Sequence, residues 1–284
     1  MGVYVIATAQ AQTTMSNLVL PPEVLDHVVD YLDTIRALRN CCLVSKSWIP
    51  RTRKHLFAEI KFDVEQKLRS WKRTFPDPST SPACYAKALS IDCPQAVVAA
   101  DAEAGGWIRG FSCVICFYVG GHSATATEES TVSLVPFHRF SPVIKSLHVD
   151  FSVLSSSWVF NLILSFPLLE DLKVSAYNTS TDDGGGPNGL PTIVRTPSPP
   201  VFTGSLHLFL SQGGMSLMTR WLLSLPGGIH FREFTSTWFH DEDPSLTMAL
   251  VEKCSRTIET LDITSHLRTS IRHCRPHRLL TFPP

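Results

Sequence analysis

Residues 18–62 decide how the chain is organised, and they read LVLPPEVLDHVVDYLDTIRALRNCCLVSKSWIPRTRKHLFAEIKF. Pro21 and Pro22 are tolerated in the first turn of a helix, and Glu23 favours the positive end of the helix dipole. Apolar residues then recur at a spacing that places them on one helical face. They are Val24, Leu25, Val28, Val29 and Leu32. A first helix is therefore predicted at this point.

Two further short helices are predicted in the same stretch. The second begins at Asp33 or Thr34, and its apolar face is lined by Ile35, Leu38, Cys41 and Cys42. Ser45 or Ser47 can cap the third helix, which leaves Pro50 in the first turn, where a proline does little damage. A unit of roughly 40 residues buries too little apolar surface to be stable alone, so it is expected to need a partner or a neighbouring domain.

Three motifs follow one another along this stretch. They are LPPEV at residues 20–24, CLVSKSWIPR at 42–51 and HLF at 55–57. Together they resemble an F-box, and in particular the F-boxes of the large families found in mushroom-forming (basidiomycete) fungi. Each motif alone is common, so it is their order that carries the resemblance. A generic three-helix cap at the N-terminus is the alternative.

The resemblance implies a docking function. F-boxes bind the Skp adaptor of cullin-based ubiquitin ligases through an apolar helical surface, and the adaptor connects them to the cullin scaffold. Carried over residue by residue, the contact would involve Leu20, Pro21, Val24, Leu25, Val28, Leu32, Leu43, Val44 and Trp48. Some of these side chains must instead hold the three helices together, and the sequence does not separate the two groups.

After residue 62 the pattern changes to short runs in which apolar and polar residues alternate, as in strands with one buried face. The clearest runs are LSI at 89–91, LHV at 147–149, LKV at 172–174, LHL at 206–208 and LDI at 261–263. Residues 111–119 and 231–239 are two less regular candidates. The runs recur about every 29 residues, and Leu-x-Leu strands at such spacing are typical of leucine-rich repeats.

Amphipathic segments between these runs support a repeat. Residues 158–167 and 217–226 both end in serine, an apolar residue and proline, and residues 71–76 have a similar ending. Proline does not continue a helix, so each segment is predicted to be a helix that ends before the next strand. A further helix is predicted from Pro244 to about Cys254. The predicted fold class is therefore α+β or α/β: a small three-helix F-box followed by an irregular leucine-rich-repeat-like αβ solenoid. A different α/β domain is the alternative.

The predicted domain organisation has three parts. Residues 1–17 are a disordered leader, residues 18–62 the F-box, and residues 63–284 a leucine-rich-repeat-like region that recognises a substrate. Residues 178–200 contain five prolines and four glycines and are predicted to form a disordered loop. A solenoid needs a polar cap over its last apolar face. Either a makeshift cap follows the last strand, or the C-terminus is truncated; the cap residues would be Leu267, Ile271, Leu279 and Leu280.

Charge is unevenly distributed, although the formal net charge is zero. Residues 1–35 contain four acidic residues and no Lys or Arg, whereas residues 36–73 contain eleven Lys or Arg and three acidic residues. Such an asymmetry reflects either solvated faces or a charged partner. No window is apolar enough to cross a membrane. Eight cysteines without a regular framework or a secretory signal are typical of a cytoplasmic or nuclear protein with reduced thiols.

No constellation of catalytic residues is present, so the chain is not expected to be an enzyme, and no cofactor is expected. Cys113 and Cys116 form a C-x-x-C motif, but in a strand they would point to opposite faces and could not bind one metal ion. The glycine-rich segment at 184–189 lacks the Lys and Ser or Thr that follow a phosphate-binding loop. Basic clusters occur without any recognised nucleic-acid-binding motif, so a nucleic-acid partner is not expected.

The predicted function is that of a substrate-recognition subunit of an SCF-type cullin-RING ubiquitin ligase, which selects clients for ubiquitin-dependent degradation. A non-catalytic interaction scaffold that does not engage a ligase is the alternative. Client contacts are expected from polar strand positions that point away from the repeat core, onto a surface that is commonly concave in solenoids. These positions are Ser90, Asp92, His148, Asp150, Lys173, Ser175, His207 and Asp262. A register slip of one residue would exchange the two faces, and the sequence does not identify the client.

Overall fold

The computed structural model describes residues 21–92, 107–120, 143–150, 156–176, 202–210, 214–225, 228–239 and 244–266. The chain divides into two compact units, Met1–Leu56 and Phe57–Pro284. The predicted leader at 1–17, the predicted loop at 178–200, Leu20 and the predicted cap residues of the C-terminus lie outside the described residues. Among the described helices, none combines the length and the apolar character that crossing a membrane requires.

The first unit is helical, as predicted. Its elements are α1 (Pro22–Asp30), α2 (Ile35–Val44), the 3₁₀ helix η1 (Lys46–Trp48) and α3 (Ile49–Leu56). The Thr34 side chain caps α2 by accepting a hydrogen bond of 3.1 Å from the backbone N–H of Ala37. The Ser45 hydroxyl accepts from the N–H of Ser47 and so opens η1. Pro50 falls in the first turn of α3, where its missing N–H leaves no helical hydrogen bond unmade.

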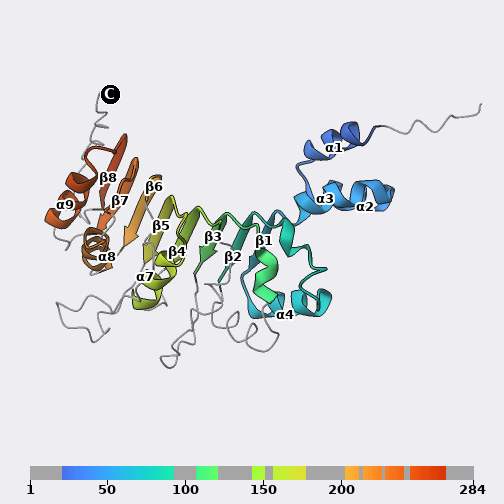
Figure 1. Ribbon diagram of the computed structural model, residues 1–284, viewed down its shortest axis with the longest axis horizontal. Helices are drawn as coiled ribbons and strands as arrows, with labels where there is room; N and C mark the ends of the chain where they lie inside the picture. Colours follow the sequence, from blue (N-terminus) through green and yellow to red (C-terminus); the bar gives the residue numbers. More distant parts are fainter. Residues whose placement is uncertain are drawn as a thin grey trace, which may run out of the picture. The chain divides into compact units, whose positions relative to one another are not determined.

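The second unit is built on parallel strands. Within the described residues, eight of them form one sheet, and their order in space is their order in the sequence (Figure 1). They are β1 (Glu59–Phe62), β2 (Ala88–Ile91), β3 (Cys116–Val119), β4 (Ser146–Asp150), β5 (Asp171–Ala176), β6 (Ser205–Leu210), β7 (Glu233–Phe239) and β8 (Thr260–His266). Parallel neighbours cannot be joined by a tight turn, so each pair of strands requires a crossover connection.

Helices and 3₁₀ helices belong to these crossovers. They are α4 (Glu65–Thr74), η2 (Pro82–Tyr85), η3 (Trp107–Phe111), α7 (Ser156–Leu164), α8 (Gly214–Leu223) and α9 (Pro244–Cys254). The prediction that prolines stop the helices is confirmed: α4 ends just before Phe75-Pro76, and α7 ends just before Phe166-Pro167. The bounds of α9 are those predicted. In Figure 1, α4 and α7 lie along the same side of the sheet.

Strand alternation places the core between the sheet and this layer of helices. One row of inward side chains crosses the sheet in register, and it consists of Ile60, Leu89, Phe117, Leu147, Leu172, Leu206, Phe234 and Leu261. All are buried except Leu261 on the last strand, which is half-buried. Ring contacts join the layers, since Phe62 of β1 meets Trp71 of α4 and Phe117 of β3 meets Phe166 after α7.

Two details of the predicted strands were wrong. Residues 111–119 do not form one strand, because η3 extends to Phe111 and only Cys116–Val119 pairs with β2. Phe111 and Val114 are instead buried ahead of the strand. The strand β1 was not predicted at all. Its four residues begin three residues after α3 ends, so the alternation of Ile60 and Phe62 is too short to stand out beside the helical pattern.

Candidate functional site

An apolar stripe lies on the surface of α1. Val24, Val28 and Tyr31 are spaced by four and three residues, which places them on one helical face. Their exposed fractions are 44%, 43% and 75%. On the same helix Val29 is buried at 1% and packs inside the unit. Apolar side chains this exposed are not part of the core of the helical unit.

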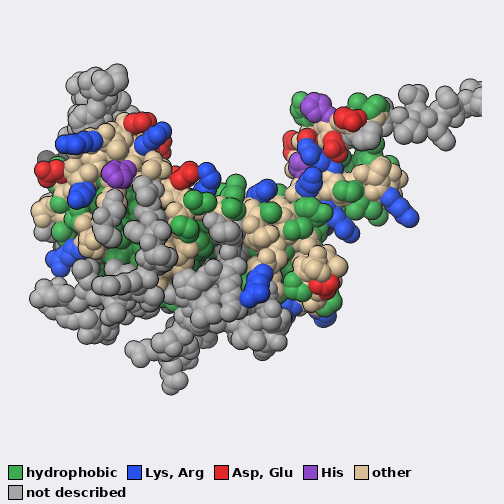
Figure 2. All heavy atoms as spheres, viewed as in Figure 1, with side chains coloured by type: hydrophobic (Ala, Val, Ile, Leu, Met, Phe, Trp, Pro, Cys, Tyr) green, Lys and Arg blue, Asp and Glu red, His purple; other side chains and the backbone are tan. Residues whose placement is uncertain are grey.

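A second group of exposed apolar residues lies on α2. Ile35, Leu43 and Val44 are 62%, 86% and 70% exposed, whereas Leu38 and Cys41 of the same helix are buried. We call the two groups together the helical apolar surface; it consists of Val24, Val28, Tyr31, Ile35, Leu43 and Val44. Figure 2 shows hydrophobic side chains at the surface over both α1 and α2. An exposed apolar surface of this kind is typical of a docking site.

The structure divides the nine residues for which adaptor contact was predicted. Five of them are exposed: Pro21, Val24, Val28, Leu43 and Val44. Three are half-buried: Leu25, Leu32 and Trp48. Leu20 lies outside the described residues. The half-buried side chains therefore contribute to the packing of the helices. Tyr31 and Ile35 were not predicted as contacts. A signal was present for Tyr31, which lies seven residues after Val24 and thus on the same stripe.

A polar clasp ties α1 to α3. The guanidinium of Arg51 donates two hydrogen bonds to the carboxylate of Asp30, from Nε to Oδ1 at 2.7 Å and from Nη2 to Oδ2. The ring nitrogen Nε2 of His55 lies 2.7 Å from Oδ1 of the same carboxylate. Hydrogen bonds from Arg51 and then His55 lower the pKa of Asp30 to about 2. The clasp thus fixes the end of α1, and with it the apolar stripe, against α3.

The second unit carries a row of polar side chains on the face of the sheet that points away from the core. In register across the eight strands, this outer row consists of Lys61, Ser90, Tyr118, His148, Lys173, His207, Thr235 and Asp262. Five of the eight residues predicted to contact a client lie in it. Lys173 and Asp262 are exposed, and Ser90, His148 and His207 are half-buried.

The other three predicted client residues follow the outer row towards the carboxyl ends of the strands. Asp92 is half-buried and forms an ion pair of 3.7 Å with Lys61. Asp150 and Ser175 pair with each other across β4 and β5, but they are only 5% and 6% exposed. Since so little of their surface is accessible, these two side chains can support the outer row but offer little area to a partner.

Aromatic rings order the middle of the outer row. The rings of Tyr118 and His148 meet edge to face, with centroids 4.6 Å apart, and His148 Nε2 lies 3.3 Å from the hydroxyl of Ser175. The ammonium of Lys173 lies 5.4 Å from the centre of the Phe209 ring, on which His207 also stacks. Tyr118 and Phe209 were not predicted as site residues. Their outward strand positions, on the same face as the predicted polar residues, were the available signal.

The environment keeps both histidines of this row neutral near pH 7. Burial first, and then the charge of Lys173, lowers the pKa of His148 to about 4. The same two causes lower the pKa of His207. At neutral pH the positive charge in the middle of the row is therefore carried by Lys173.

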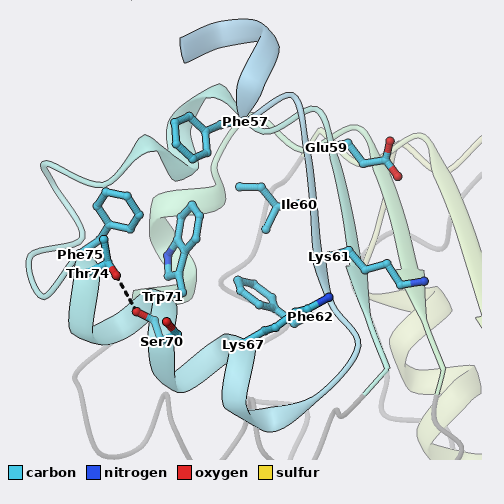
Figure 3. Close-up of a pocket in the computed structure, with 10 residues that line it drawn as sticks. All are labelled: Phe57, Glu59, Ile60, Lys61, Phe62, Lys67, Ser70, Trp71, Thr74 and Phe75. Atoms are coloured by element: carbon cyan, nitrogen blue, oxygen red, sulfur yellow. Dashed lines mark hydrogen bonds between the residues drawn. The ribbon is translucent and has the colours of Figure 1, made fainter. Parts of the chain in front are cut away.

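A pocket of about 370 Å³ opens between the edge strand β1 and helix α4 (Figure 3). Figure 3 shows Ile60 and Phe62 pointing from β1 towards α4, whereas Glu59 and Lys61 point to the other side of the strand. Three rings complete the apolar lining, and they belong to Phe57, Trp71 and Phe75. The centroids of the last two are 4.7 Å apart. Among the described residues β1 pairs with β2 alone, so the pocket lies at the β1 end of the sheet that they form.

The C-x-x-C motif is not arranged as the sequence suggested. Cys113 lies in the turn after η3, and Cys116 opens β3, so the two cysteines do not share one strand. In the described part of the chain, no group of three or more His, Cys, Asp or Glu side chains is placed to hold a metal ion.

Comparison with known proteins locates one domain in the chain. No curated protein matches the sequence. The family model of the F-box domain matches residues 18–49, a range that contains every residue of the helical apolar surface. F-box domains bind the Skp adaptor. The helical unit of this chain therefore contains an F-box domain, and the helical apolar surface lies on it.

Proposed function

We propose that this chain is the substrate-recognition subunit of an SCF-type cullin-RING ubiquitin ligase. Its F-box domain docks on the Skp adaptor, and through the adaptor on the cullin scaffold, while the second unit holds a client protein. The observation that carries the proposal is the helical apolar surface. Six large side chains within the F-box match are between 43% and 86% exposed, on a unit that has its own small core.

Burial of this surface would contribute several kcal/mol to docking. Burying a large apolar side chain contributes roughly 1.5–3 kcal/mol relative to full exposure. Six partly exposed side chains therefore supply several kcal/mol, which must offset the entropy lost on association. A specific interface typically buries about 1,200–2,000 Å² in total. The stripe on α1 and the exposed residues of α2 supply the apolar centre of such an interface.

We infer that the second unit is an irregular leucine-rich-repeat-like solenoid that presents the client site. Its strands begin at residues 59, 88, 116, 146, 171, 205, 233 and 260, so the repeat is 25–34 residues long. The strictly sequential, parallel strand order supports this proposal, because in a repeat protein each unit packs only on its neighbours. The outer row, with its ordered rings at Tyr118, His148 and Phe209, is the surface we propose for client contact.

In this proposal the chain has no catalytic site of its own. It accelerates ubiquitin transfer by holding a client near the active site of another protein, so that the reaction becomes effectively intramolecular. Selection of clients for degradation in the cytoplasm or the nucleus is the role that follows.

Co-expression with the Skp adaptor tests the proposal. The full-length chain should elute from a size-exclusion column in a stoichiometric complex with the adaptor, and Val28→Asp should abolish that complex. Met248→Asp is the matched control, because Met248 is also exposed, at 56%, but lies on α9 of the second unit. If the folded wild-type chain elutes without the adaptor, the protein is instead an interaction scaffold that does not engage the ligase.

A further inference from the structure

Three side chains that carry nitrogen donors lie next to one another in the middle of the outer row. His148 of β4, Lys173 of β5 and His207 of β6 are paired in register across three neighbouring strands. Neighbouring strands of a sheet are about 4.8 Å apart, and side chains at paired positions point to the same face. The lysine therefore stands between the two histidines. We call these three residues the His–Lys–His triplet.

The ammonium of Lys173 is exposed and keeps its full charge. In the described part of the chain, no ion pair includes it. It lies instead 5.4 Å from the centre of the Phe209 ring, which follows His207 towards the carboxyl end of β6. A ring face attracts a cation without neutralising it. Phe209 thus orients the ammonium and leaves its charge available to a ligand.

Both histidines of the triplet are held in place by rings and retain a nitrogen for a ligand. His148 meets the edge of Tyr118, and its Nε2 lies 3.3 Å from the hydroxyl of Ser175. A neutral imidazole has one N–H donor and one acceptor nitrogen, so a hydroxyl that donates to Nε2 leaves the N–H on Nδ1. The ring of His207 stacks on Phe209, and no hydrogen bond joins it to another described residue.

The local charge balance selects a ligand with a single negative charge. Burial and the charge of Lys173 lower the pKa of both histidines, so near pH 7 the lysine supplies the one positive charge of the triplet. Three carboxylates act on the histidines: Asp150, Asp171 and Glu233. Asp150 is only 5% exposed, and Oδ1 of Asp171 accepts hydrogen bonds from the N–H and the hydroxyl of Ser205. A second negative charge on the ligand would be unbalanced and repelled by these groups.

We propose that the His–Lys–His triplet binds one carboxylate, with the Lys173 ammonium as its counter-charge and the imidazole N–H groups of His148 and His207 as further donors. A carboxylate carries one charge and accepts several hydrogen bonds through its two oxygens. The identity of its carrier rests on the proposed function: a client protein would supply it, as an Asp or Glu side chain or as its chain terminus. The binding itself requires only this chain.

Nuclear magnetic resonance of the histidine rings tests the proposal on the full-length chain. At pH 7 the protein is titrated with two capped peptides that each have one carboxylate, acetyl-Gly-Glu-Gly-amide on its side chain and acetyl-Gly-Gly-Gly at its chain terminus. The variants His148→Gln and His207→Gln assign the two ring signals. At least one peptide should shift both signals with one saturating Kd and leave the signal of the exposed His230 unmoved. The peptide that binds more tightly identifies the source of the carboxylate.

Lys173→Gln separates a built site from general attraction to the protein. The substitution removes the charge but keeps a polar side chain, and it should raise the Kd of the peptide at least tenfold, because a charge-assisted interaction is lost. The matched control is Lys253→Gln, which removes the charge of an exposed lysine near the end of α9 and should change the Kd less than twofold. An unchanged His230 signal in both variants shows that they are folded.

Three results would overturn the inference. They are the absence of a saturating shift at either histidine with both peptides, an equal Kd for wild type and Lys173→Gln, and tighter binding of inorganic sulfate, a tetrahedral dianion, than of either peptide. The experiment uses neither the adaptor nor a client. A chain that binds the carboxylate but not the adaptor would therefore contradict the proposed function alone, and the reverse result would contradict this inference alone.

Discussion

Arg51 holds Asp30 through both carboxylate oxygens, although 21 residues separate them in the chain. The contact joins the end of α1 to α3 and, with His55, lowers the pKa of Asp30 to about 2. A carboxyl whose pKa is lower in the folded state than in the unfolded chain stabilises the fold when it is ionised. The clasp should therefore contribute its full stability above about pH 4 and lose it as the pH falls towards 2.

Replacing Asp30 by asparagine (Asp30→Asn) should remove the pH dependence of stability that the clasp contributes. The variant is expected to have a lower melting temperature than wild type at pH 6, and the difference should shrink as the pH falls from about 4 to about 2, where wild type loses its ionised carboxylate. Thermal unfolding followed by circular dichroism across this range provides the measurement. A difference that stays constant with pH would show that the clasp does not act through the charge of Asp30.

His148 predicts a second pH window, in the sheet. Its pKa is about 4 in the folded protein against 6.5 in the unfolded chain, so the unfolded chain binds the proton more readily between these values. Stability should therefore fall as the pH drops from about 6.5 to about 4. Because the ring is only half-buried, solvent screening reduces the effect to about 1–2 kcal/mol. Chemical denaturation of wild type and His148→Gln at pH 7 and pH 4.5 measures it, and equal pH dependence in the two proteins would contradict it.

Gly120 leaves room for the Tyr118 ring and for the Asp150 side chain beside it. A Cβ atom at position 120 would lie 2.7 Å from the Tyr118 hydroxyl oxygen and 3.0 Å from Cβ of Asp150. Gly120→Ala should therefore reduce the free energy of unfolding by about 1–3 kcal/mol, the usual cost of overpacking. Gly110→Ala is the control, because its new methyl group would meet Ala83 at 3.3 Å and should cost less. Urea denaturation compares the two, and a larger loss for Gly110→Ala would contradict the packing described.

Leu172 and Leu261 occupy the same inward row on β5 and β8. Leu172 is fully buried, whereas Leu261, on the last strand, is only half-buried. Leu172→Ala should cost about 3–4 kcal/mol of unfolding free energy and Leu261→Ala about 1–2 kcal/mol, because the cavity is smaller where less of the side chain is enclosed. Equal costs, measured by urea denaturation, would indicate that Leu261 is as enclosed as Leu172.

The sequence predicted those parts of the structure in which local pattern and burial agree. The five clearest alternating runs became β2, β4, β5, β6 and β8, because alternation over three residues already separates a buried face from an outer one. In the F-box, the predicted start of the second helix agrees with the Thr34 cap of α2, whereas Ser45 caps the 3₁₀ helix η1 ahead of α3 and not the third helix itself. In both cases the determining interactions lie within a few residues of each other.

The remaining features depend on contacts between distant residues, which periodicity does not reveal. The clasp between Asp30 and Arg51 follows from the packing of two helices. Alternation assigned Ser175 to the outer face of the sheet correctly, but it does not predict how exposed a residue on that face is. Ser175 is only 6% exposed, and His148 lies against it. Likewise, the surface position of Ile35 became clear only when the helices were packed and Val29 filled the interior, whereas the spacing from Val24 already indicated that of Tyr31.

The central claim is that the helical apolar surface binds the Skp adaptor. Isothermal titration of purified adaptor into the full-length protein tests it most directly, with wild type, Leu43→Asp and Met248→Asp compared under the same conditions. Wild type and Met248→Asp should bind with equal Kd, and Leu43→Asp should bind at least 100-fold more weakly, because a charge would replace an apolar anchor at the interface. Binding by wild type and Leu43→Asp with the same Kd, or no binding by folded wild-type protein, would contradict the claim.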